Sequence, residues 1–256
     1  MRKFMYSYNN NSESGIKLKN ALGIRLISHN NSLFKGDNKT LVFNWGCSDL
    51  PREVRKCEVI NNENAVALAV NKLRALEAMV DSDVNCVPFT TNRQVVIDAL
   101  RNRNEVVYCR THLTGHDGAG IVVVRNGDMV PEAKLYTFKV HSENEYRITV
   151  CNGRVVCRQR KVRLDTRPAT GYNDEIKTTG GGYGFKWVTR GIPPAVEEEA
   201  LKAIDALELH YGGVDVIWEG RSAFVLEVNT APQLTDLACQ ALANALIEDY
   251  GLNEEV

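Results

Sequence analysis

Residues 213–236, GVDVIWEGRSAFVLEVNTAPQLTD, form the stretch of this chain that decides its fold. Two runs of β-branched and other apolar residues flank a short turn at residues 219–222, which contains a glycine. Short apolar runs on either side of such a turn predict a β-hairpin. Each predicted strand also carries one acid among its apolar residues, Asp215 in the first strand and Glu227 in the second.

These two acids are candidates for a metal site. A carboxylate inside an apolar strand is costly unless it is paired, hydrogen-bonded or bound to a metal. Glu227 and Asn229 are two residues apart and therefore point to the same face of a strand, where Asp215 of the neighbouring strand can join them. Two carboxylates and an amide oxygen suit Mg²⁺, which usually also binds substrate phosphates. An ordinary hairpin with salt-bridged acids is the alternative, and the spacing alone favours neither.

The composition is that of an ordinary soluble globular protein. The 256 residues are 44% hydrophobic and 25% charged, with a net charge of −1. This balance argues against a general binder of nucleic acids or membrane surfaces. The sequence has no apolar run of about 18 residues, which a membrane span would need. The N-terminus lacks the apolar core of a signal peptide, and the seven cysteines form no CxxC pair, so we expect a cytoplasmic protein with reduced thiols.

The first half of the chain divides into two parts. Residues 1–60 read as strand, helix and further short strands, which predicts a small α/β unit. Beyond it, an alanine- and leucine-rich pattern predicts one helix over residues 64–79, then a strand over 84–89 and a second helix over 92–103. Residues 105–124 predict two strands around a loop that contains Gly115, Gly118 and Gly120.

The second half predicts more strands and two long helices. Strands are expected over residues 135–140 and 145–150, and Asn152-Gly153 predicts a tight hairpin turn into a strand that begins at about Val155. Residues 164–192 show little apolar periodicity and predict a loop. Helices are expected from Pro193-Pro194 to about His210 and from Leu234 to Tyr250.

The hairpin over residues 213–236 resembles the metal-binding end of the ATP-grasp superfamily, and most closely the RimK-like group of glutamate ligases. That group shows a G-V-D strand, a turn and an apolar strand ending in E-V-N-x-x-P, and all of these are present here. The resemblance covers roughly residues 60–240. It implies an α+β fold that holds ATP between two sheets, with a small N-terminal α/β domain over 1–60, a small subdomain over 61–134 and a large subdomain over 135–256.

The resemblance also assigns roles to individual residues. Asp215, Glu227 and Asn229 match the metal ligands, for Mg²⁺ or alternatively Mn²⁺. Lys72 matches a helix lysine that reaches the nucleotide phosphates, although a solvated helix lysine is the plain alternative. The segment 135–138 matches the hinge that binds adenine. The full set of residues expected to bind ATP is Lys72, Arg110, Gly115, Gly118, Gly120, Leu135, Tyr136, Phe138 and Glu145, the last of these on the ribose.

A second set of basic residues is expected to act on the transferred phosphoryl group. Arg147 belongs to the triplet Glu145-Tyr146-Arg147, which matches the acid-x-Arg of the family. Arg158, Arg160 and Lys161 lie on the strand that follows. Since alternate residues of a strand share a face, Arg158 and Arg160 are expected to act together and Lys161 to face the other way. A solvated charged strand is the alternative reading of this run.

The activity that the resemblance implies is ATP-dependent ligation of a carboxylate to an amine through an acylphosphate. The alternatives are an ATP-grasp kinase acting on a small molecule and a non-catalytic nucleotide-binding module. The expected partners are ATP, a carboxylate and an amine, the last two most simply an amino acid or peptide. The basic residues favour an acidic substrate. A nucleotide substrate and a homo-oligomer both remain open, and no membrane partner is expected.

Overall fold

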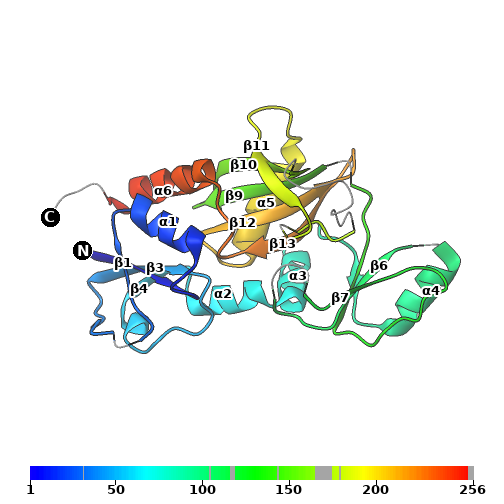
Figure 1. Cartoon of the computed structure of the whole chain (residues 1–256), viewed down its shortest axis with the longest axis horizontal. Coiled ribbons are helices and arrows are strands. Elements are labelled where there is room, and N and C mark those ends of the chain that lie inside the picture. Colours follow the sequence, from blue (N-terminus) through cyan, green and yellow to red (C-terminus); the bar gives the residue numbers. More distant parts are fainter. Residues whose placement is uncertain are drawn as a thin grey trace.

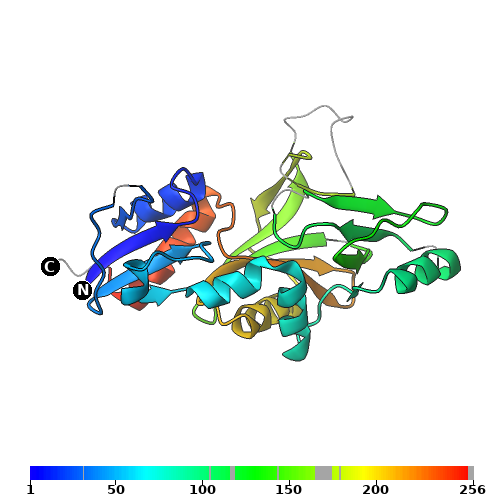
Figure 2. The ribbon, with the colours of Figure 1, turned by 90° about the horizontal axis from the view of Figure 1, so that it is seen from below.

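The computed structural model describes residues 1–30, 32–103, 105–115, 119–142, 144–164, 175–178 and 180–252. Its strands form three sheets, which lie along the long axis of the molecule (Figures 1 and 2). We call them the N-terminal sheet, the central sheet and the small antiparallel sheet. The α+β fold class predicted from the sequence is confirmed.

The N-terminal sheet is parallel, with the strand order β2-β1-β3-β4. Ser12 caps its helix by accepting a hydrogen bond from the backbone N–H of Gly15, as expected for a serine at this position. The predicted alternation of strand and helix is therefore confirmed. The elements are β1 (Arg2–Ser7), α1 (Glu13–Ala21), β2 (Arg25–Leu26), β3 (Thr40–Trp45), the 3₁₀ helix η1 (Val54–Lys56) and β4 (Glu58–Ile60).

The single helix predicted over residues 64–79 is two helices, α2 (Glu63–Val70) and α3 (Lys72–Asp81). They meet at Asn71, whose backbone is extended and whose side chain accepts a hydrogen bond from the backbone N–H of Arg74. Asparagine favours such a capping position over a helix interior because its short side chain bonds to the backbone nearby. The break places Lys72 in the first turn of α3, next to the site described below.

The small antiparallel sheet has the order β5-β8-β6-β7. Its core is formed by α4 and the buried residues Val96, Leu100, Val107 and Tyr136. The strand predicted over residues 84–89 is wrong, since that segment makes one isolated bridge, from Cys86 to Val225, before β5 begins. The elements are β5 (Phe89–Thr90), α4 (Arg93–Arg103), β6 (Val107–Arg110), β7 (Ile121–Val124) and β8 (Leu135–Phe138).

The central sheet is antiparallel throughout, with the order β11-β10-β9-β12-β13. The turn at Asn152 and Gly153 has positive φ at both residues, 44° and 70°, so the predicted tight turn is confirmed. The loop predicted over residues 164–192 is wrong in part, because residues 183–187 form a strand on β10. The strands are β9 (Asn144–Cys151), β10 (Arg154–Arg163), β11 (Tyr183–Trp187), β12 (Tyr211–Trp218) and β13 (Ala223–Asn229).

Two helices cover the central sheet and leave one region of it open. Helix α5 (Pro194–Ala206) packs through Val196, Ala200 and Ile204 on one face of the sheet, and it ends earlier than the predicted His210. Helix α6 (Asp236–Tyr250) contacts α1 of the N-terminal unit as well as β9 and β10 (Figure 1). The face opposite α5 therefore stays accessible at the end of the sheet away from α6. Within the described residues, no helix combines the length and the apolar character needed to cross a membrane.

Candidate active site

A cavity of about 920 Å³ lies between the open face of the central sheet and the small antiparallel sheet. We call it the large cavity. Tyr8 and the start of α1 close it on the N-terminal side. Most of the residues that the sequence nominated line this one space. They are Lys72, Arg110, Gly115, Phe138, Glu145, Arg147, Lys161, Asp215, Glu227 and Asn229.

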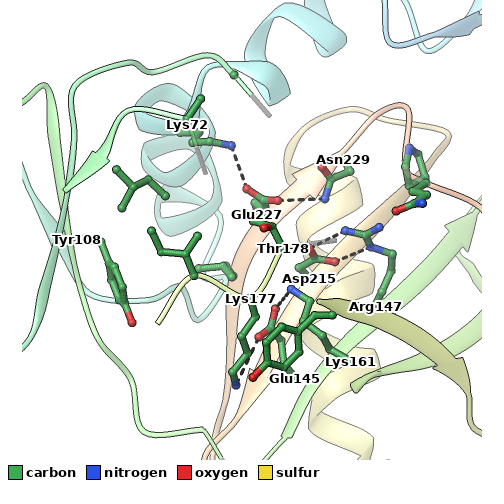
Figure 3. A pocket seen from close by; sticks show the side chains of 18 of the residues that line it. Lys72, Tyr108, Glu145, Arg147, Lys161, Lys177, Thr178, Asp215, Glu227 and Asn229 are labelled. Carbon is green, nitrogen blue, oxygen red and sulfur yellow. Dashed lines mark hydrogen bonds and ion pairs between the residues drawn. The ribbon is translucent and has the colours of Figure 1, made fainter. Parts of the chain in front are cut away.

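The three proposed metal ligands lie together on one face of the central sheet (Figure 3). Asp215 of β12 is the direct cross-strand neighbour of Glu227 of β13, and Asn229 follows two residues later opposite Gly213. The register of the pairing shifts after Asp215, where Val216 pairs with Val225. The hairpin predicted from the sequence therefore exists and brings the two acids and the amide to the same face.

Asp215 is neutralised by a buried arginine. Arg147 of β9 lies directly opposite it on the other side of β12 and binds both carboxylate oxygens, at 2.7 Å from Nε and 2.8 Å from Nη2. The guanidinium also stacks on the ring of Phe185 in β11, 4.1 Å from the ring centroid. Burial opposes the charge on Arg147, but the carboxylates of Asp215, Glu227 and Glu145 together outweigh burial and raise the pKa of the arginine.

Glu227 is held ionised by a different cation. The Nζ atom of Lys72 donates to its Oε2 at 2.9 Å (Figure 3). Burial acts to raise the pKa of Glu227, but Lys72, Arg110 and Arg147 together outweigh it and lower that pKa to about 2. Arg110 is itself desolvated in the cavity wall, which lowers its pKa, while the charge of Glu227 acts in the opposite direction. The site thus concentrates ionised groups of both signs.

The donor set fits a hard divalent cation. Asp215 and Glu227 are ionisable oxygen donors on adjacent strands, and Asn229 adds a neutral amide beside them, with Nδ2 at 3.4 Å from Glu227 Oε1. Magnesium prefers such ligands and usually binds through one or two carboxylates together with substrate phosphates. Both oxygens of Asp215 are occupied by Arg147, so this carboxylate would have to share its charge between the arginine and a metal ion.

Glu145, the predicted ribose contact, is buried beside two lysines. It accepts a hydrogen bond from Lys161 of β10, and Lys177 lies 3.9 Å away (Figure 3). Burial raises the pKa of this carboxyl, and the lysines reduce that effect only in part. A carboxylate between two lysines is well placed to accept hydrogen bonds from sugar hydroxyls, and its role on the ribose stays a prediction.

Arg158 and Arg160 lie outside the large cavity, in contrast to the expectation that they share the site. Gln159 is the cross-strand neighbour of Arg147, so Gln159 and Lys161 share the face of Arg147, and the two arginines point away from it. Arg158 instead binds Glu197 of α5 at 2.6 and 2.8 Å, and Arg160 is exposed. The alternation of the strand was correctly predicted, but the sequence did not show which of its two faces was the inner one.

The predicted hinge, residues 135–138, lines the cavity through its second half only. Leu135 and Tyr136 are buried in the cores on either side of β8, and the Tyr136 hydroxyl donates to the carbonyl of Pro131. Both residues therefore point away from the cavity. The backbone of β8 is also paired on both edges, with β5 on one side and β6 on the other. The cavity is lined by Thr137 and Phe138 and by the connection that follows them, residues 139–142.

The Gly-rich loop joins β6 to β7 as predicted. Gly115 lines the cavity. Gly120 instead closes the base of the loop, where its carbonyl accepts from the backbone N–H and from the hydroxyl of Thr111. A β-carbon at Gly120 would lie 2.5 Å from Nδ1 of His112, and its φ of 73° also favours glycine. Gly118 lies outside the described residues.

Sequence reasoning missed a cluster centred on Glu175. This carboxylate accepts hydrogen bonds from Arg125 at 2.6 Å, from Lys139 at 3.3 and 3.4 Å and from the Tyr108 hydroxyl at 3.5 Å. Burial acts against the charge, but the two cations outweigh it and lower the pKa of Glu175. The cluster ties residues 175–178 to the small antiparallel sheet. Nothing in the spacing of the sequence signals a contact between segments so far apart.

A family model matches part of this architecture. Residues 137–248 match the model described as RimK-like ATP-grasp domain, which spans the central sheet, α5 and most of α6. The chain has the ATP-grasp fold, and the resemblance drawn from residues 213–236 is confirmed. No curated protein matches the chain by sequence at the significance required.

Solved structures resemble nearly the whole chain. The ATP-grasp ligase PsnB complexed with a minimal precursor has a TM-score of 0.69 at 13% identity, covering 98% of this chain and 99% of that chain. The D-alanine–D-alanine ligase of Bacillus anthracis has a TM-score of 0.67 at 13% identity, with 97% and 96% covered. The macrocyclase MdnC of Microcystis aeruginosa MRC, bound with precursor peptide MdnA, has a TM-score of 0.61 at 13% identity, with 97% and 100% covered. At these identities the likeness concerns the fold.

Proposed function

We propose that this protein is an ATP-dependent ligase that joins a carboxylate to an amine through an acylphosphate. One observation carries the proposal. Asp215, Glu227 and Asn229 stand together in a large cavity between two sheets, and Lys72 and Arg147 bind the two acids directly. The structures of similar fold that support it include the ATP-grasp ligase PsnB, complexed with a precursor, and a D-alanine–D-alanine ligase.

The cavity residues suit the binding of a triphosphate. Lys72, Arg110 and Arg147 face the acids from three separate elements, and their charges would lie beside the phosphates of ATP. Asp215, Glu227 and Asn229 would hold Mg²⁺, or Mn²⁺, which supplies further positive charge at the phosphate oxygens when it is bound. Phosphoryl transfer depends mainly on such positioning and charge, so no nucleophile from the protein is needed.

The reaction has two steps. A carboxylate oxygen of the first substrate attacks the γ-phosphorus of ATP, and the bond from that phosphorus to the bridging oxygen breaks, so that ADP leaves with the electron pair. The nitrogen of the amine then attacks the acyl carbon, the carbon–oxygen bond to phosphate breaks, and the nitrogen gives up a proton. Arg110, Arg147 and Lys161 are the residues we expect to hold the carboxylate and the transferred phosphoryl group. The walls of the cavity would limit the access of water to the acylphosphate.

The experiment that tests this function follows ATP turnover by the whole chain with Mg²⁺ against pools of amino acids, peptides and nucleotides. Free phosphate and product mass are measured together. A ligase gives ADP, phosphate and a product whose mass is the sum of two pool members minus water. A phosphorylated product without free phosphate would instead identify a kinase. Nucleotide binding without turnover in any pool is the result expected of a binding module, or of a ligase whose substrate is not in the pools.

A further inference from the structure

A second cavity, of about 450 Å³, lies where the N-terminal unit, helices α2 and α3 and the end of β13 meet. We call it the small cavity. Lys72, Gly115, Glu227 and Asn229 line both cavities. The two spaces therefore meet at the pair of Lys72 and Glu227, so a molecule in the small cavity would present one end to the proposed metal set. The volume is within the range of about 300–1,000 Å³ that is common for ligand sites.

One side of the small cavity is apolar. Val70 ends α2, and Leu76 and Met79 lie along α3. Leu226 and Val228 of β13 complete this side. Most of these residues belong to the largest hydrophobic cluster of the protein or pack against it, so the wall is fixed by the core behind it. Such a surface stabilises an apolar group by removing it from water.

The charges of the small cavity are already compensated. Lys72 is the single cation among its described lining residues, and it binds Glu227 at 2.9 Å. Asp49, at the N-terminal side, is an exposed carboxylate bound by Arg55 at 2.8 Å. An anionic side chain placed here would lose water and meet two carboxylates without a spare cation, which is costly. A neutral side chain avoids that cost.

The large cavity carries more positive charge. Six described cations line it, namely Lys72, Arg110, Lys139, Arg147, Lys161 and Lys177. Five of them contact carboxylates of the same wall, whereas Arg110 forms no such ion pair within the described residues. An anionic substrate and a triphosphate belong on that side of the junction. The amine substrate must reach the acyl carbon and needs no cation to bind it. It is therefore best accommodated in the small cavity.

We infer that the small cavity binds the amine substrate, and that this substrate carries a neutral, largely apolar side chain. The inference rests on the proposed function, since it assigns the second substrate of the same site. The sequence predicted an acidic substrate, and the inference states which of the two substrates this is. The acidic substrate would be the carboxylate donor, bound in the large cavity, and the amine substrate would carry no acidic side chain.

Three small probes test this inference by direct binding to the whole chain, with titrations followed by nuclear magnetic resonance. L-leucinamide is a primary amine with an apolar side chain. L-glutamic acid α-amide is the same amine with an anionic side chain, and 4-methylpentanamide keeps the apolar chain without the amine. We expect leucinamide to bind at least about tenfold more tightly than either, a difference of about 1.4 kcal/mol. Equal or tighter binding of the glutamic acid amide, or no binding of leucinamide, would overturn the inference.

Matched variants locate the probe. Val70→Phe fills the small cavity, and Val80→Phe introduces the same ring on the exposed side of α3. Leucinamide affinity should fall at least about tenfold in the first variant and stay within about twofold in the second. Ser48→Trp blocks the exposed mouth without changing the core and should act like Val70→Phe. Unchanged affinity in Val70→Phe and Ser48→Trp would overturn the assignment.

Nucleotide binding is measured on the same samples with a non-hydrolysable ATP analogue and Mg²⁺. Failure of the analogue to bind wild-type protein would contradict the proposed function. The selectivity among the three probes would still decide what the small cavity accepts. The two results are therefore separable.

Discussion

Asp215 and Glu227 are cross-strand neighbours on β12 and β13, but the ion pairs that they form differ in burial. The Arg147 and Asp215 side chains are 10% and 3% exposed, whereas those of Lys72 and Glu227 are 22% and 29% exposed. Removing one member of a buried ion pair leaves an uncompensated charge, which costs far more than the loss of a pair near solvent. Substitutions of the two acids should therefore differ in their effect on stability, although both acids belong to the proposed metal site.

We predict that Asp215→Asn lowers the free energy of unfolding by about 3 kcal/mol, because it weakens the buried partner of Arg147. Glu227→Gln should lower it by about 1 kcal/mol, since Lys72 can turn toward water. Urea denaturation of the two variants beside the wild type measures both values. An equal or larger loss in Glu227→Gln would show that the burial of the pairs does not control their contribution. Both variants should lose ATP turnover.

The thiols provide a second prediction at the scale of single residues. Burial raises the pKa of Cys86 and Cys151 to about 12, and a thiol reacts as its thiolate. In the native protein, a disulfide reagent at pH 8 should modify Cys47 and Cys57 first, because these two are partly exposed. All seven should react in denaturant. Rapid native modification of any buried thiol would contradict the packing. The buried set is Cys86, Cys109, Cys151, Cys157 and Cys239.

For single residues, the sequence predicted which side chains of the hairpin lie together, but it did not predict their ion-pair partners. The spacing of Glu227 and Asn229, with Asp215 on the neighbouring strand, was enough to place three side chains on one face. The partners Arg147 and Lys72 come from elements 68 and 155 residues away along the chain. Such long-range pairing depends on sheet order, which local spacing does not contain.

Strand β10 illustrates the same limit at the scale of the element. Its alternation is regular at Arg158, Gln159 and Arg160, but two opposite faces fit the same charged sequence. The pairing of Gln159 with Arg147 decides which face is inside, and only then is Lys161 placed in the cavity.

We predict a corresponding difference between two substitutions on β10. Lys161→Met should weaken the affinity for an ATP analogue by about tenfold, because it removes the cation beside Glu145, about 1.4 kcal/mol. Arg158→Met should leave that affinity within about twofold and reduce stability by at most about 1 kcal/mol, since its bond to Glu197 is partly solvated. Isothermal titration calorimetry measures the affinities. A larger loss of affinity in Arg158→Met than in Lys161→Met would contradict the placement of Arg158 outside the site.

Two other elements show why local pattern was insufficient. Strand β11, with the sequence YGFKW, alternates aromatic residues with Gly184 and Lys186, but this five-residue pattern follows a glycine-rich segment and is a weak signal. Its pairing with β10 makes the strand evident in the structure. The break between α2 and α3 was hidden in an unbroken apolar pattern. Only the capping by Asn71 marks it, and one asparagine within a helix pattern is a weak signal.

Helix α6 connects the N-terminal unit to the central sheet at the scale of the whole molecule. Its buried residues share a hydrophobic cluster with Met5 and Phe43 of the N-terminal sheet and with Cys151 and Tyr211 of the central sheet. The division at residue 60 predicted from the sequence stays a prediction. The packing of α6 nevertheless shows that the N-terminal unit shares a core with the C-terminal helix.

We predict that Leu242→Ala, in the middle of α6, lowers the free energy of unfolding by about 3 kcal/mol, because it leaves a cavity in this shared core. Leu237→Ala is the matched control, since Leu237 is 59% exposed on the same helix, and it should change stability by less than about 0.5 kcal/mol. Thermal unfolding measures both. Similar effects of the two substitutions would contradict the packing of α6.

The overall architecture was more predictable than its internal spaces. The order of elements and one specific hairpin were enough to predict the ATP-grasp fold. The two cavities, by contrast, arise where three units of the chain meet. Tyr8 follows β1, Lys72 begins α3 and Glu227 lies in β13, and only the folded chain shows that they line both spaces.

The origin of the oxygen in the released phosphate tests the central claim most directly. Turnover is run in water labelled with ¹⁸O, with the carboxylate and amine that the pools identify, and the phosphate is analysed by mass spectrometry. If the carboxylate attacks ATP, its own oxygen stays on phosphorus, and the phosphate should carry no solvent label. One solvent ¹⁸O in each phosphate would show that water attacks the γ-phosphorus, and this would contradict the acylphosphate route.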